Sequence, residues 1–184
     1  MWTFNKEDLV EEVRVGGTFL NKSGAYEMTI DAIEDKLTTN GAKQVVFKFS
    51  NEAGAKVNIF YTYGKINGEM IDFKVRNLNH LCSLLKVMPE KLSAMQGKQI
   101  GVFLKADGTS RDGRFINWDI DGFYDVKTKG TAKELTEKSG IGDAYAKMVE
   151  KYEKEKPVET VRGDSATTTT STTTTDTTDE FPFN

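Results

Sequence analysis

A chain of 184 residues with 38% hydrophobic residues is long enough for one domain that buries a core and carries appended segments. One cysteine, Cys82, and one histidine, His80, exclude an internal disulfide and a four-ligand zinc site within one chain. The net charge of −3 excludes little by itself, because the charge is unevenly divided along the sequence.

The charge distribution separates a basic middle from an acidic end. The segment from Lys36 to Arg114 carries 13 bases and six acids, whereas the segment from Pro157 to Asn184 carries one base and five acids. This division is typical of a protein that binds a polyanion and carries its own competing polyanion. Charge runs are also common on solvated faces, so the charge alone leaves nucleic-acid binding open.

The first residues predict a short helix. Asn5 is a good cap, apolar residues between 9 and 13 form one stripe, and Gly16-Gly17 ends the segment. Trp2 and Phe4 are expected to pack this helix onto a core.

Three strands are expected next. Alternating apolar and polar residues predict strands at Ala25–Ile33, Gln44–Ser50 and Lys56–Tyr63. Asn40-Gly41 and the residues 51–54 are turn signals between them. The three segments therefore predict an antiparallel meander.

The apolar period changes after the third strand. A helix capped by Asp72 is predicted from apolar residues at three- and four-residue steps. A short second helix is predicted at Pro89–Met95. Two further strands are predicted at Ile100–Lys105 and Phe115–Val126, joined by a basic, glycine-containing loop. The second of these strands is expected to bend near Asp121-Gly122.

The C-terminal third predicts helices and then disorder. Thr131-Ala132-Lys133-Glu134 is a capping box, and it begins a helical arm that runs to Lys156. The threonine-rich segment that follows cannot bury apolar surface, so it is expected to be disordered. The chain thus divides into a β-rich domain at 1–130, a helical arm at 131–156 and a linker with an acidic tip at 157–184.

The last nine residues place three acids before an aromatic end, with Asn184 after Phe183. This tip resembles the C-terminal tail of bacterial and phage single-stranded DNA-binding proteins, in which acidic residues precede a Pro-Phe end. The resemblance implies that the chain binds single-stranded DNA and that the tail recruits replication and recombination proteins. The residues it assigns to partner binding are Asp176, Asp179, Glu180, Phe181, Pro182 and Phe183.

Three strands, a helix and two strands is the order of the OB-fold, a small barrel that binds single strands and oligosaccharides. The predicted fold class is therefore mainly β: a five-stranded OB-fold barrel with a helix between strands 3 and 4. A short N-terminal helix, a C-terminal helical arm and a disordered tail are added to it. Other small β-rich domains with one inserted helix remain alternatives.

A sequence-tolerant single-strand binder needs cations for the phosphates and aromatic faces on which bases stack. Lys48, Phe60 and Phe103 fall on strand faces opposite the apolar ones, so they are expected to point outward, although terminal helices would also cover such rings. Trp118 shares a face with apolar neighbours and is expected to be buried. The predicted DNA-binding residues are Lys36, Lys43, Lys48, Phe60, Tyr63, Phe103, Lys105, Arg111 and Arg114.

No residue pattern indicates catalysis. His80 has no neighbour that would form a nucleophile–base pair, and Asp119–Asp125 lacks the twelve-residue calcium pattern. No cofactor, metal, signal peptide or membrane span is predicted. Together with these observations, the resemblance of the tail implies a non-enzymatic, cytoplasmic, phage-encoded protein that coats single-stranded DNA during replication, recombination or repair. An RNA-binding OB module and a structural or adaptor protein that binds only protein are the alternatives, and a homo-oligomer is left open.

Overall fold

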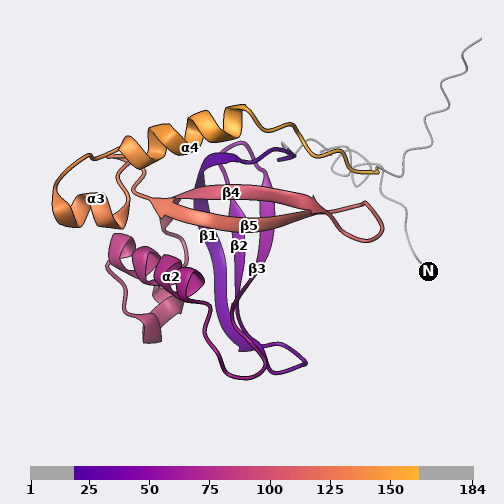
Figure 1. The fold of residues 1–184 in the computed structure, drawn as a ribbon. Helices are drawn as coiled ribbons and strands as arrows, with labels where there is room; N and C mark the ends of the chain where they lie inside the picture. Colours follow the sequence, from indigo (N-terminus) through magenta and orange to yellow (C-terminus); the bar gives the residue numbers. More distant parts are fainter. Residues whose placement is uncertain (1–18, 162–184) are drawn as a thin grey trace, which may run out of the picture.

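The computed structural model describes residues 19–161. The predicted N-terminal helix with Trp2 and Phe4, and the linker with its acidic tip, lie outside these residues. The described part is mainly β, with one sheet and a few helices (Figure 1). None of its helices has the length and apolar character needed to span a membrane.

Five antiparallel strands form one sheet in the order β3-β2-β1-β4-β5. The strands are β1 (Gly24–Leu37), β2 (Lys43–Ser50), β3 (Lys56–Gly64), β4 (Gln99–Thr109) and β5 (Ile116–Tyr124). All five predicted strands are confirmed. β1 extends past the predicted end at Ile33 because its second half pairs with β2 as far as Leu37 opposite Lys43.

The long strand β1 joins two halves of the sheet. Its residues 24–29 pair with β4, and its residues 29–37 pair with β2. A register shift between Ile30 and Ala32 marks a bulge, which bends a strand and increases its twist. As a result β4 and β5 run across β1–β3 in Figure 1. The buried residues between them include Met28, Ile30, Phe47, Phe49, Ile59, Val102, Leu104, Ile120 and Phe123.

The two end strands, β3 and β5, contact each other but share no hydrogen-bonded ladder among the described residues. The sheet therefore does not close into the barrel that the strand order predicts. Near α2, the carbonyl oxygens of Ile120 and Asp121 accept hydrogen bonds from the Asn77 amide, at 3.4 and 3.3 Å, rather than from β3.

The helix α2 (Asp72–Leu85) and the 3₁₀ helix η1 (Pro89–Met95) connect β3 to β4, as predicted. Asp72 is not the cap, because Ile71 holds that position and makes no side-chain capping bond. Asp72 lies instead in the first turn, where a carboxylate interacts favourably with the helix dipole. Leu81 anchors α2 in the core with no exposed surface.

The helical arm consists of α3 (Ala132–Glu137) and α4 (Asp143–Glu153). The predicted capping box is confirmed, because Thr131 Oγ1 accepts from the Glu134 amide and the Glu134 carboxylate accepts from the Thr131 amide. Glu134 also accepts from the Ala144 amide at 2.8 Å, which ties α3 to α4. Burial opposes ionisation of Glu134, but these backbone hydrogen bonds outweigh it and hold its pKa below the ordinary value.

Candidate nucleic-acid interface

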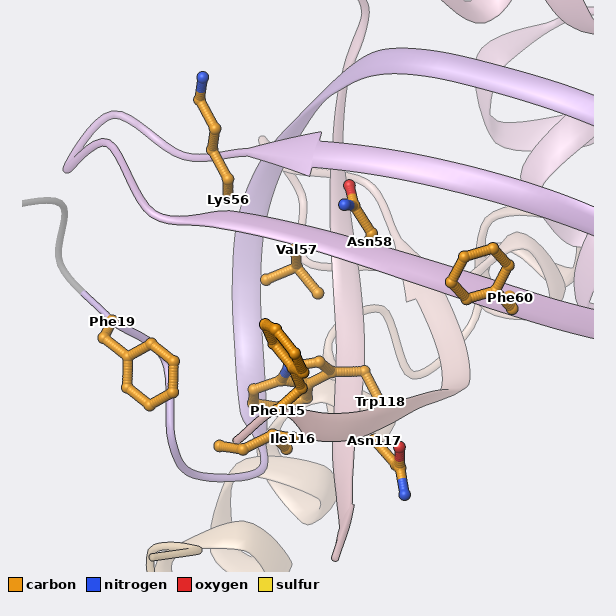
Figure 2. A pocket seen from close by; sticks show the side chains of 9 residues that line it. All are labelled: Phe19, Lys56, Val57, Asn58, Phe60, Phe115, Ile116, Asn117 and Trp118. Carbon is orange, nitrogen blue, oxygen red and sulfur yellow. The ribbon is translucent and has the colours of Figure 1, made fainter. Parts of the chain in front are cut away.

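A cleft of about 620 Å³ opens between β3 and β5, along the line where the sheet does not close. Figure 2 shows Val57 pointing from β3 toward Phe115 and Trp118 on the β5 side. The lining residues are Phe19, Lys56, Val57, Asn58, Phe60, Phe115, Ile116, Asn117 and Trp118. The cleft thus combines an apolar interior with several aromatic rings.

Phe60 is exposed because of its position in the strand alternation. Its neighbours Ile59 and Tyr61 point into the core and are buried, so Phe60 points outward. Its side chain is 62% exposed. The Nζ atom of Lys36 lies 6.0 Å from the centre of the Phe60 ring, at the limit of a cation–π contact.

Phe115 is held outward by the loop that joins β4 to β5. The Ser110 amide donates to the Phe115 carbonyl at 2.7 Å, and the Phe115 amide donates to Ser110 Oγ at 3.0 Å. These two bonds close the base of the loop and leave Phe115 68% exposed. Phe19, where the described chain begins, is 47% exposed beside it.

The same loop carries Arg111 and Arg114, both exposed. Ser110 Oγ donates to Asp112 at 2.6 Å, and this bond, with one from the Arg114 amide, lowers the Asp112 pKa. Arg114 Nε lies 3.8 Å from Asp112 in a solvent-exposed pair, which adds little binding energy and leaves the guanidinium available to a ligand. The loop thus adds two cations beside Phe115.

Cations also lie on the outward face of β2 and β3. Lys48 is opposite Asn58 in the ladder, and Lys56 is opposite Ser50. Lys48 and Lys56 are both exposed, and neither forms an ion pair with another described residue. These ammonium groups and Phe60 share one face, as the sequence predicted for Lys48 and Phe60.

Phe103 was predicted to be an outward stacking residue, and this prediction is wrong. It lies on the outward face of β4, but it is only 3% exposed because α4 covers that face. Its ring centre is 4.8 Å from that of Tyr124 and 6.2 Å from that of Tyr145. Phe103 is therefore part of a second, buried cluster and has no free face for a base.

Of the nine predicted DNA-binding residues, only Phe60 lines the cleft itself, and three of the others lie elsewhere on the sheet. Tyr63 donates its hydroxyl hydrogen to Asp35 at 2.9 Å, and burial together with this bond raises the Tyr63 pKa to about 12. Lys105 lies 3.7 Å from Asp107 on β4, and Lys43 is opposite Gly64 at the far end of β3. These side chains are not brought together with Phe115 and Trp118.

The sequence missed the four other lining residues that carry an aromatic ring or a charge: Phe19, Lys56, Phe115 and Trp118. Trp118 was expected to be buried, but it is half-buried, packing on the core while lining the cleft. A signal was present for two of them. Lys56 is in phase with Lys48 and Phe60 on the outward face, and Phe115 directly follows the basic loop.

Within residues 19–161, no group of three or more His, Cys, Asp or Glu side chains is arranged to hold a metal ion. No protein-family model matches this sequence, and no curated protein matches it. The candidate interface consists of open aromatic rings between two strand edges, with cations on both sides.

Proposed function

We propose that this chain is an OB-fold protein that binds single-stranded DNA with little sequence preference. In this role it coats exposed strands during phage DNA replication, recombination or repair. Its acidic C-terminal tip recruits partner proteins. The protein performs no catalysis and acts through binding alone.

The arrangement of the strands supports the OB assignment. An OB-fold is a partly open, five-stranded Greek-key barrel, and it binds oligonucleotides on the face of strands 2 and 3 between two loops. Here the end strands β3 and β5 meet without pairing, and a helix joins β3 to β4. The face of β2 and β3 carries Lys48 and Phe60, and the loop between β4 and β5 carries Arg111 and Arg114.

The observation that carries the proposal is the open aromatic cleft. Phe60 and Phe115 each expose more than half of their surface at a site that also contains Trp118. Unpaired bases present free faces to such rings, whereas bases in a duplex are stacked on one another. The cleft therefore favours single strands over duplexes.

The expected energetics follow from these residues. Base–aromatic stacking contributes about 1–3 kcal/mol per base and tolerates any sequence, because every base has a π face. Lys48, Lys56 and Arg111 add phosphate contacts, which weaken as salt concentration rises. Together they give sequence-tolerant, salt-dependent affinity.

The described chain ends beside the basic loop of the proposed DNA site. The chain leaves the described region at Val161, whose amide donates to the Gly113 carbonyl at 2.9 Å in the basic loop. In this proposal the acidic tip, which resembles a partner-binding tail, follows this point in the chain and binds the partner proteins. Proteins held by it are brought close to the coated strand.

Fluorescence of Trp118 provides the test. The sequence has two tryptophans, so Trp2→Phe leaves Trp118 as the sole indole, located in the cleft. Titration of this variant with oligo-dT should quench its emission, with an affinity that falls steeply between low and high salt. A labelled oligonucleotide followed by anisotropy provides an independent affinity.

The outcomes separate the candidate functions. Tighter binding of oligo-dT than of the matching RNA supports the DNA assignment, whereas the reverse preference identifies an RNA-binding module. Binding by anisotropy without any change in Trp118 emission moves the site away from the cleft. No binding of either nucleic acid overturns the proposal and leaves a protein that binds only protein.

A further inference from the structure

The gap between β3 and β5 has one open end and one clamped end. At the clamped end, α2 contacts both strands. The Asn77 side-chain amide on α2 donates to the hydroxyl of Tyr61 on β3 at 3.1 Å. The same amide lies within hydrogen-bonding distance of the Ile120 and Asp121 carbonyls on β5. One side chain thus connects the two unpaired strand edges.

A second residue of α2 makes the same connection. Lys74 Nζ lies 3.1 Å from Asp119 Oδ1 on β5 and 4.5 Å from the centre of the Tyr61 ring on β3. The Lys74 side chain is only 16% exposed, so solvent screens this contact less than a surface pair. Tyr61 itself is fully buried, and burial raises its pKa, so it remains a neutral partner.

The clamped residues are direct chain neighbours of the cleft aromatics. Tyr61 follows Phe60 on β3, and Asp119 follows Trp118 on β5. Successive side chains of a strand point to opposite faces, so fixing one residue fixes the direction of the next. The contacts that hold Tyr61 and Asp119 therefore also orient Phe60 and Trp118.

We propose that Asn77 and Lys74 are positioning residues for the cleft, which set the separation of β3 and β5 and hence the spacing of the base-stacking rings. Neither residue lines the cleft. They act through Tyr61 and Asp119, because stacking requires ring geometry that is fixed to a fraction of an ångström. This inference rests on the proposed function, since it assigns to α2 a role in the binding of bases.

The test compares two equal charge changes on one helix. Asn77→Asp removes the amide that donates to both strands, and Asn79→Asp adds the same charge at an exposed position of α2. Each variant is titrated by anisotropy with labelled oligo-dT and with an abasic oligonucleotide of equal length, which keeps the phosphates and lacks the bases. Thermal unfolding of each variant confirms that it is folded.

Asn77→Asp should weaken oligo-dT binding about fivefold or more, the loss of one well-stacked base. Its affinity for the abasic strand should match that of Asn79→Asp, because the phosphate contacts and the added charge are the same. Equal losses of affinity for the two oligonucleotides, or no loss of affinity for either, overturn the inference while leaving single-strand binding intact. Wild-type protein that binds neither strand overturns the proposed function and this inference with it.

A second variant covers the case in which Asn77→Asp does not fold. Lys74→Met keeps the aliphatic stem against Tyr61 and removes the ammonium that pairs with Asp119. It should also reduce oligo-dT binding more than abasic-strand binding. Equal affinity of Lys74→Met and wild type for both strands contradicts the role of Lys74.

Discussion

Two groups of aromatic residues lie on this sheet, and they differ in what covers them. Phe103 and Tyr124 pack beneath Tyr145 of α4, with ring centres 4.8 to 6.2 Å apart, and Tyr152 of α4 belongs to the same buried cluster. Phe60 and Phe115 stand at the β3–β5 cleft with most of their surface exposed. Both groups lie outside the main core, and both lie near lysines.

The difference shows that an outward aromatic residue on a strand does not by itself indicate a binding surface. α4 supplies Tyr152, whose hydroxyl donates to Asp121 at 2.8 Å, and this contact fixes the helix on β5. No described helix covers Phe60 or Phe115 to the same degree, so their faces remain available. The covered cluster should therefore govern stability, and the open group should govern binding.

Phe103→Ala should give the largest effect. Removing a buried ring and leaving a cavity under α4 should lower the free energy of unfolding by about 3–5 kcal/mol. Urea unfolding measures this change, with Phe60→Ala as the matched variant, which should stay within about 0.5 kcal/mol of wild type. A comparable loss of unfolding free energy in the two variants would contradict the distinction between the covered and the open aromatic residues.

Phe60→Ala and Phe115→Ala should each weaken single-strand binding by about 1–3 kcal/mol, because each removes a stacking face. Anisotropy with labelled oligo-dT measures the affinity. Met88→Ala, which removes a 65% exposed apolar side chain outside the cleft lining, is the control and should bind as wild type does. An equal loss in the control would point to a general effect of exposed apolar side chains.

Tyr152→Phe should lower the free energy of unfolding by about 1 kcal/mol at pH 8, since it removes the hydrogen bond to Asp121. Burial and the nearby Asp121 charge raise the Tyr152 pKa. The stabilisation is therefore complete below the ordinary tyrosine pKa of about 10 and is lost as the pH rises above it. Urea unfolding from pH 8 to 11 should show the difference between variant and wild type shrinking; a constant difference would contradict this assignment.

Lys48→Ala should have the smallest effect on affinity at moderate salt. It should reduce the slope of log affinity against log salt concentration by about one unit and leave stability unchanged. Lys133→Ala, on the exposed surface of α3, is the matched control and should keep the wild-type slope. If Lys48→Ala left the slope unchanged, the bound DNA would not contact the outward face of β2.

The sequence predicted the elements better than the site. Alternation identified all five strands, and the box at Thr131 identified α3, because these signals depend on residues close in the chain. It did not distinguish Phe60 from Phe103, since both alternate outward and only the docking of α4 separates them. Trp118 was misplaced for a related reason: a residue facing the core is exposed where the sheet fails to close.

The gap between β3 and β5 also could not be predicted from residues that are close together in the sequence. Asn77 has no special spacing on α2, and its contacts with Tyr61 and with the β5 carbonyls depend on how the helix seats between the two strands. Contacts between residues 43 or 44 positions apart cannot be read from the helical period. The tip at Asp176–Asn184 is predicted from the sequence alone and lies outside the described residues.

The extended segment after α4 has a practical consequence for protein engineering. The Val158 amide donates to the Asn21 carbonyl at 2.6 Å, so the two ends of the described region emerge on the same side, near the cleft. A dye attached at either end of the described region is therefore held beside the proposed binding site. The turn between α3 and α4 is exposed at Lys138 and Ser139 and provides an attachment point outside the cleft lining.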